Sequence, residues 1–257
     1  MLHIEDLKVE LAGKIILDHI DLDIYSGETH ILFGPNGSGK TSLLMTIMGY
    51  PQYKVISGKI FFKDQDITHM PINERAALGI GMSYQRPPTI HGLKTRQMVN
   101  LCAGEEIDAD ALAERVNFKD FLNRDINAGF SGGEIKRSEL LQLMAQKPDL
   151  MLFDEPESGV DMENMVLVGK TIAALLQRNG HSTDNRSKMK VKQERTRMGL
   201  IITHTGYILD YLTGDKGQVL FNGRLSCVSN PREILGCIGD SGYEECVRCM
   251  TDLIEIS

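Results

Sequence analysis

A phosphate-loop motif near the N-terminus constrains the fold more than any other feature of the chain. Residues 34–41 read GPNGSGKT, which fits the pattern G-x-x-x-x-G-K-[ST]. The motif follows an apolar run, Glu28–Phe33, and precedes a helical pattern, Thr41–Met48, that stops at Gly49. A glycine-rich turn between a strand and a helix N-terminus binds anions, because its backbone N–H groups point inward. The sequence therefore predicts an α/β fold built around a phosphate site.

The side chains of this loop predict a nucleotide triphosphate with its metal ion. Lys40 is expected to reach the β- and γ-phosphates, and Thr41 is expected to hold Mg²⁺. We therefore expect ATP and Mg²⁺ as ligands. The residues expected to contact the nucleotide are Gly34, Pro35, Asn36, Gly37, Ser38, Gly39, Lys40, Thr41 and Ser42.

A second apolar run predicts the carboxylates that complete this site. Leu150–Phe153 is wholly apolar, as expected for a buried parallel strand, and it leads directly into Asp154 and Glu155. Asp154 is expected in the Mg²⁺ shell, and Glu155 is expected to orient or deprotonate the attacking water. By itself such a run would be weak evidence for a catalytic site. Downstream of a phosphate loop, however, it predicts hydrolysis of the bound nucleotide.

A second helix start also suits an anion. Ser131-Gly132-Gly133-Glu134 opens the amphipathic pattern Glu134–Gln146. Ser131 and Glu134 fit a capping box, which alone would only mark a helix N-terminus. The two glycines, however, leave the first N–H groups of the helix uncovered, so that a phosphate can approach them. Two phosphate-binding helix starts in one chain suggest a nucleotide shared between two chains.

Together these motifs resemble the ABC ATPase family, whose signature is a Ser-Gly-Gly tripeptide. The resemblance extends over nearly the whole chain. It implies that residues 131–133 of one chain close over ATP held by the phosphate loop of another, in an ATP-dependent homodimer. It also implies that Gln85 is the Q-loop glutamine, which contributes to catalysis and to the Mg²⁺ site. His204, directly after the apolar run Leu200–Thr203, corresponds to the switch histidine that contacts the γ-phosphate.

One feature of this family is missing. An aromatic residue commonly stacks on adenine from an early strand turn, and here that turn reads Glu10-Leu11-Ala12-Gly13. Stacking of a base on an aromatic ring is worth about 1–3 kcal/mol in nucleic-acid systems. We therefore expect modest ATP affinity and weak base selectivity.

The order of elements predicts one ABC-type nucleotide-binding domain of the P-loop NTPase class over residues 1–257. Alternating strands and helices favour a mostly parallel core sheet covered by helices. The early strands Leu2–Val9 and Ile15–Ile24 predict an antiparallel β subdomain. A short helical subdomain, about residues 86–146, is inserted into the α/β core. Asn222-Gly223 predicts a hairpin near the C-terminus.

Four stretches carry a narrower resemblance: Phe130–Leu143 (FSGGEIKRSELLQL), Met82–Leu93 (MSYQRPPTIHGL), Gly49–Ile60 (GYPQYKVISGKI) and His204–Leu212 (HTGYILDYL). Together they resemble SufC, the ATPase of the SUF iron–sulfur cluster assembly system. The resemblance implies a SufB/SufD-like scaffold as partner, which docks on the surface after Gln85, where Pro87 and Pro88 stiffen the loop. The turn Asp154–Glu157 and the short helical subdomain depart from this pattern. The alternative is the ATPase subunit of an ABC membrane transporter.

Charge and hydropathy give no reason to expect binding to nucleic acid or insertion into a membrane. The net charge of −7 gives no reason to expect nucleic acid. No apolar run reaches the roughly 18 residues that a membrane span needs, so direct membrane insertion is not expected. The N-terminal residues do not resemble a signal peptide, and the expected location is the cytoplasm.

Two further features have more than one interpretation. The segment His181–Met198 contains six basic residues and two acids, and is either a solvated surface loop or a docking arm for an acidic partner or phosphate polymer. Cys246 and Cys249 form a C-x-x-C motif, with Cys227 and Cys237 upstream. They either pack on one face of a terminal helix or bind a metal or cluster transiently.

Overall fold

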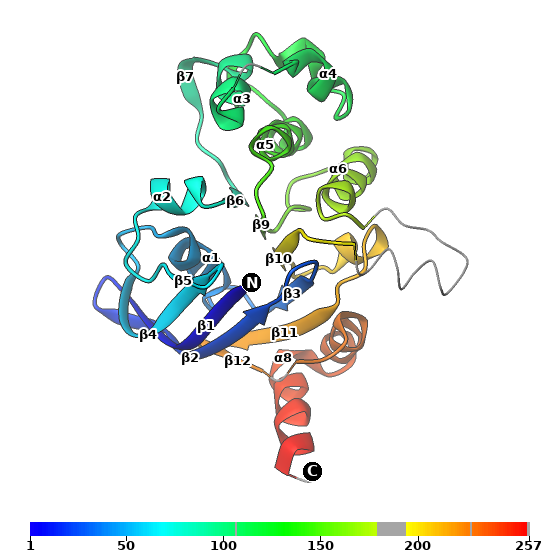
Figure 1. The fold of residues 1–257 in the computed structure, drawn as a ribbon. Helices are drawn as coiled ribbons and strands as arrows, with labels where there is room; N and C mark the ends of the chain where they lie inside the picture. Colours follow the sequence, from blue (N-terminus) through cyan, green and yellow to red (C-terminus); the bar gives the residue numbers. More distant parts are fainter. Residues whose placement is uncertain (106, 179–193, 227, 256–257) are drawn as a thin grey trace.

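The computed structural model describes residues 1–105, 107–178, 194–226 and 228–255, the last seven by their helical backbone only (Figure 1). Single turns of 3₁₀ helix lie at Lys119–Phe121 and Tyr207–Asp210. The strands are β1 (Leu2–Leu11), β2 (Lys14–Ile24), β3 (Thr29–Phe33), β4 (Lys54–Phe62), β5 (Gln65–Asp66), β6 (Ile80–Ser83), β7 (Ile90–Lys94), β8 (Asp125–Ile126), β9 (Leu150–Asp154), β10 (Met198–Ile202), β11 (Lys216–Phe221) and β12 (Arg224–Leu225). The helices are α1 (Lys40–Met48), α2 (Ile72–Ala77), α3 (Thr95–Ala103), α4 (Ala109–Glu114), α5 (Gly132–Gln146), α6 (Met162–Leu175) and α8 (Pro231–Glu255).

The core sheet has the strand order β12-β11-β3-β10-β9-β6 and is parallel except for β12. Every residue of β3, β6, β9 and β10 is buried, which explains why these strands read as nearly continuous apolar runs. Because parallel strands end at the same edge, the segments after β3, β6, β9 and β10 meet there. The predicted mostly parallel α/β core is confirmed.

The antiparallel sheet has the order β2-β1-β4-β5, with Leu2 opposite both Ile24 and Phe62. Its inward side chains pack against α1 and one face of the core sheet in a single apolar cluster. This sheet therefore supports the start of α1 from outside the parallel core.

The helical part of the molecule stands apart from both sheets in Figure 1. Helices α3, α4 and α5 enclose their own apolar cluster, in which Phe118, Phe121 and Phe130 are in mutual ring contact. The short ribbon β7-β8 connects this cluster to the segment that follows β6. Helix α5 also contacts α6 and β6, so it joins the helical part to the core sheet.

The second face of the core sheet is covered by α6 and α8. Helix α8 is interrupted at Gly242, whose backbone is not helical. Cys246 is fully buried in this apolar cluster, and Cys237 is packed beside it. Cys227 and the Cys249 side chain lie outside the described residues. Cys246 thus packs as the terminal-helix interpretation expects.

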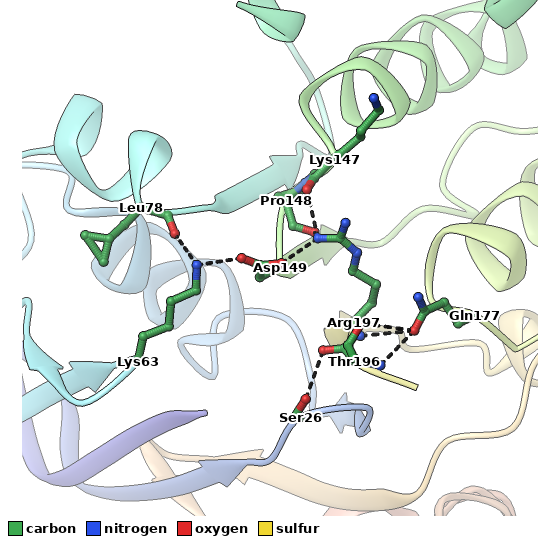
Figure 2. A network of polar contacts seen from close by, with 9 residues as sticks. All are labelled: Ser26, Lys63, Leu78, Lys147, Pro148, Asp149, Gln177, Thr196 and Arg197. Carbon is green, nitrogen blue, oxygen red and sulfur yellow. Dashed lines mark hydrogen bonds and ion pairs between the residues drawn. The ribbon is translucent and has the colours of Figure 1, made fainter. Parts of the chain in front are cut away.

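A polar network joins the turns at the amino ends of the core strands (Figure 2). The Asp149 carboxylate, just before β9, pairs with Lys63 at 2.5 Å and with Arg197 at 2.6 Å. The Gln177 side chain accepts a hydrogen bond from the Thr196 backbone at 2.7 Å. Arg197 belongs to the basic segment that was interpreted as either a solvated loop or a docking arm, and its side chain is bound to Asp149 and to the carbonyl oxygens of Lys147 and Pro148 just before β10. Residues 179–193, which hold most of the basic segment, lie outside the described residues.

Candidate nucleotide-binding and catalytic site

The phosphate loop turns from β3 into α1 at the C-terminal edge of the core sheet. Gly34 adopts φ 155°, and a Cβ at this position would lie 2.3 Å from the carbonyl oxygen of Leu220. Only glycine fits this close approach. Gly39 occupies the N-cap of α1 with φ 107° and provides no capping side chain. The first N–H groups of α1 therefore face the loop without a side-chain partner at the cap, as an anion site requires.

The Lys40 side chain folds back over the loop that precedes it. Its ammonium donates to the carbonyl oxygens of Gly34 at 2.7 Å and Pro35 at 2.9 Å, and the residue is almost fully buried. Burial lowers the pKa of Lys40, while the nearby carboxylates of Glu155 and Asp154 act in the opposite direction. The buried Ser38 hydroxyl has no hydrogen-bond partner among the described residues. A phosphate oxygen in this loop would provide the missing acceptor.

Thr41 and Asp154 bring two oxygen donors together below the loop. The Thr41 hydroxyl donates to the Asp154 carboxylate, with oxygen–oxygen distances of 3.0 and 3.2 Å. Asp154 is 1% exposed, and burial raises the pKa of its carboxyl group. A hydroxyl and a carboxylate are hard oxygen ligands of the kind that Mg²⁺ prefers. The donor set therefore fits Mg²⁺.

Three predicted catalytic side chains meet beside this pair. The Gln85 amide, from the end of β6, donates a short hydrogen bond to Glu155. The Nδ1 atom of His204, after β10, lies 3.4 Å from the other Glu155 oxygen. Glu155 itself is 7% exposed. Strand ends far apart in sequence thus place an amide, a carboxylate and an imidazole around one point.

A cavity of about 550 Å³ is lined by the phosphate loop together with Gln85 and Glu155, whereas His204 and Asp154 are not among its lining residues. Its lining also includes residues that the sequence did not predict for the site: Ile15 and Ile16 of β2, and the Asn222-Gly223 turn between β11 and β12. The Gly223 N–H donates to the carbonyl oxygen of Ser38 at 3.3 Å, so the hairpin is attached to the phosphate loop.

The signature residues form the predicted helix cap but lie away from this cavity. The Glu134 N–H donates to the Ser131 hydroxyl at 3.3 Å, and the Ser131 N–H donates to the Glu134 carboxylate at 2.7 Å. A Cβ on Gly132 would lie 2.0 Å from the carbonyl oxygen of Gly159. Residues 131–133 are not among those lining the cavity. One copy of the chain does not bring its two anion sites together.

A buried polar network that the sequence did not predict links α5 to the segment before Gln85. The Lys136 ammonium donates to the carbonyl oxygen of Tyr84 and pairs with Glu139 at 3.2 Å. Glu139 accepts hydrogen bonds from the Tyr84 N–H at 2.7 Å and from the Ser83 hydroxyl at 2.9 Å. Burial raises the pKa of the Glu139 carboxyl group. The sequence did contain a signal for this network, because Lys136 and Glu139 lie three positions apart within the predicted helix.

The chain was compared with known families and proteins. The family model described as ABC transporter matches residues 17–158, more than half of the chain. The probable ATP-dependent transporter SufC of Escherichia coli is 34% identical over 241 residues, which is 88% of this chain and 90% of that protein. Vegetative protein 296 of Bacillus subtilis is 35% identical over 257 residues, covering 95% of this chain and 92% of that protein.

A solved structure has the same fold. The ATP-binding cassette MJ0796, determined as a dimer bound to ADP and Pi, superimposes with a TM-score of 0.71 at 18% identity. The match covers 90% of this chain and 98% of that one. Among the described helices, none has the length and hydropathy of a membrane span. From the family match, the full-length relatives and the fold, the chain belongs to the ABC transporter family, is one of its ATP-binding and ATP-hydrolysing cassettes, and is similar to SufC.

Proposed function

We propose that this chain is the ATPase subunit of an iron–sulfur cluster assembly complex of the SUF type. ATP binding and hydrolysis would drive a conformational change in a SufB/SufD-like scaffold protein. The similarity to SufC over 88% of the chain supports this assignment. We infer further that residues 1–257 act as one catalytic domain, with the helical part at about 86–146 as the docking platform, and that the complex works in the cytoplasm.

The observation that carries the proposal is a groove beside the catalytic residues. The groove has a volume of about 190 Å³ and is lined by Tyr84, Pro87, Pro88 and Ile90, with α5 on its opposite side. Gln85 lies within this segment and is hydrogen-bonded to Glu155. A stiff, partly apolar loop loses little entropy when it binds a partner. A change at the γ-phosphate therefore has a short covalent path to the docked protein.

The side chains of the site have distinct roles in the proposed reaction. Lys40 and the N–H groups of residues 34–42 bind the phosphates of ATP. Glu155 orients the attacking water or accepts its proton, while Gln85 and His204 hold Glu155 and the γ-phosphate region in register. Thr41, Asp154 and Gln85 would hold Mg²⁺, which would supply positive charge to neutralise the charge that develops on the phosphate oxygens.

The signature residues act from a second copy of the chain. Because residues 131–133 do not line the cavity of their own chain, the N–H groups of Gly132 and Gly133 at the start of α5 are available to ATP held by a partner. We therefore propose an ATP-dependent homodimer with two composite sites. Mixing Lys40→Ala chains with Ser131→Arg chains restores one intact site per heterodimer, and partial recovery of ATPase activity is expected. Absence of an ATP-dependent dimer, even with the scaffold present, argues against this arrangement.

The partner is tested by co-expression of the chain with a SufB/SufD-type scaffold, followed by size exclusion without detergent. A stable complex that carries iron and sulfide is expected. Ile90→Asp is expected to dissociate it, because the substitution places a charge in the groove. Ile56→Asp is the matched control, since Ile56 is an exposed isoleucine on β4, 52% accessible. Co-purification only with a detergent-solubilised permease would instead support the transporter alternative.

A further inference from the structure

The loop that carries His204 is hydrogen-bonded to the carboxylate of Glu157, to which the sequence motifs assigned no role. Glu157 follows Pro156 in the turn after β9 and is 7% exposed. One of its oxygens, Oε1, accepts a short hydrogen bond from the Thr203 hydroxyl and a second one of 3.0 Å from the Thr205 hydroxyl. These two threonines flank His204 in the sequence.

Both hydroxyl groups are also bonded to the backbone of the same loop. The Thr203 hydroxyl accepts a hydrogen bond from the Gly206 N–H at 2.8 Å. The Thr205 hydroxyl accepts one from the Tyr207 N–H at 3.3 Å. Gly206 adopts φ 74°, and a Cβ there would lie 2.4 Å from a methyl carbon of Leu235 in α8. The loop 203–207 therefore has its conformation set by Glu157 from one side and by α8 from the other.

The other Glu157 oxygen, Oε2, is buried and has no hydrogen-bond partner among the described residues. Burial raises the pKa of the carboxyl group, which the two threonine hydroxyls and the nearby His204 oppose. A buried carboxyl group with one unpaired oxygen is costly to maintain. Proteins tolerate this free-energy cost where the carboxyl group positions other residues. Buried carboxyl groups of this kind are common at functional sites.

We propose that Glu157 is a positioning residue for ATP hydrolysis, which holds His204 against Glu155 through the Thr203 and Thr205 hydroxyls. His204 is 42% exposed and its Nδ1 atom is 3.4 Å from Glu155, so its own contacts do not fix the ring tightly. Two hydroxyl-to-carboxylate bonds on either side of it restrict the backbone from which the ring projects. The inference rests on the role of His204 proposed above.

The turn after β9 thus carries two carboxylates with separate tasks. Glu155 faces the cavity, whereas Glu157 faces the 203–207 loop. When the loop is released, the ring is expected to sample positions away from the γ-phosphate, which slows the chemical step. ATP binding depends on the phosphate loop and is expected to persist. The signature is therefore a lower kcat with an unchanged KM.

The test is a set of variants at Thr205, because this side chain is exposed and its loss does not endanger folding. Thr205→Val keeps the shape and removes the hydroxyl, and a roughly 3- to 10-fold loss of kcat is expected. Thr205→Ser restores most of the turnover. Thr213→Val, at another exposed threonine, is the matched control. Glu157→Gln, which retains an acceptor oxygen, is expected to keep more activity than Glu157→Ala.

A double-mutant cycle distinguishes positioning of His204 from a general structural effect. In a His204→Ala background, Thr205→Val is expected to change kcat by less than about 2-fold, because the ring it positions is gone. An undiminished effect in that background overturns the proposal. If His204→Ala loses turnover but Thr205→Val keeps the wild-type kcat, the positioning role of Glu157 is refuted and the catalytic role of His204 stands. Wild-type kcat in His204→Ala removes the proposed catalytic role of His204, and this inference with it.

Discussion

Lys40 is the single side chain on which nucleotide affinity is expected to depend most. Its ammonium is buried over the phosphate loop, where it donates to the backbone carbonyl oxygens of Gly34 and Pro35. Lys40→Ala removes a charge-assisted hydrogen bond, which corresponds to a loss of roughly 10- to 150-fold in ATP affinity. Titration with a fluorescent ATP analogue measures this loss, with Lys170→Ala, at an exposed position of α6, as the control. Equal affinity in wild type and Lys40→Ala would contradict the assignment.

Glu155 is expected to affect turnover and not binding. Its carboxylate lies between the Gln85 amide and the His204 ring, at the wall of the cavity. Glu155→Gln keeps the size of the side chain but removes the base, and a loss of roughly 10²- to 10⁴-fold in kcat is expected. The same variant is expected to accumulate as an ATP-bound dimer in size exclusion. Steady-state hydrolysis at the wild-type rate would refute the role of Glu155.

At the scale of elements, two arginines attach α6 and β10 to the core by contacts of different burial. Arg178, after α6, has a side chain that is 1% exposed and pairs with Asp215, and it also donates to the carbonyl oxygen of Gly27 at 3.0 Å. Arg197, before β10, is 26% exposed and pairs with a more accessible carboxylate, Asp149. The same kind of ion pair is therefore present at a buried and at a half-exposed position.

Replacing each arginine by alanine compares what the buried and the half-exposed ion pair contribute to the free energy of unfolding. Arg178→Ala is expected to lower the free energy of unfolding by about 1.5–3 kcal/mol, because it removes charge-assisted hydrogen bonds to Asp215 and Gly27 at a buried position. Arg197→Ala is expected to cost about 1 kcal/mol or less, and its effect should shrink at high salt. Urea unfolding at low and high ionic strength measures both values. Similar losses for the two variants would show that burial does not govern these pairs.

At the scale of the whole molecule, stability is expected to fall in acid because of His30 in the central strand. His30 is 2% exposed, and its ring lies close to the Gln218 side chain. Burial, with a contribution from Lys216, lowers the pKa of His30 from 6.5 to about 4. The unfolded chain thus binds a proton that the folded chain excludes, so stability falls as the pH drops from about 6.5 to about 4.

Urea unfolding at pH 7.5 and pH 5 tests the contribution of His30. The wild type is expected to lose about 2 kcal/mol from this group at pH 5, since each unit of difference corresponds to about 1.4 kcal/mol. His30→Leu removes the titrating ring and is expected to lose correspondingly less. His69→Gln, at an exposed histidine, serves as the control. An equal pH dependence in wild type and His30→Leu would exclude His30 as the cause.

The elements around the phosphate loop could be predicted because their signals are local. A largely apolar run followed by glycines or carboxylates locates β3 and β9 within one or two residues, and Gly49 marks the end of α1. Contacts between distant segments could not be predicted in the same way. One such contact is the hydrogen bond of Gly223 to the phosphate loop, and another is that of Thr205 to Glu157. Both depend on the order of the strands in the sheet, which residue type and spacing do not encode.

The position of β3 between β10 and β11 has a consequence for biosynthesis. In the sheet register Phe33 lies beside Val219, so the strand that leads into the phosphate loop leaves the ribosome long before the strand beside it. At about 5–20 residues per second, the delay is roughly 10 to 40 s. Both edges of β3 are unpaired until β10 is made, and the edge beside β11 and the hairpin side of the loop are unpaired until the end of this interval. Nascent chains that end before Lys216 are expected to pass through an ATP-agarose column, and chains extended beyond Leu225 are expected to be retained.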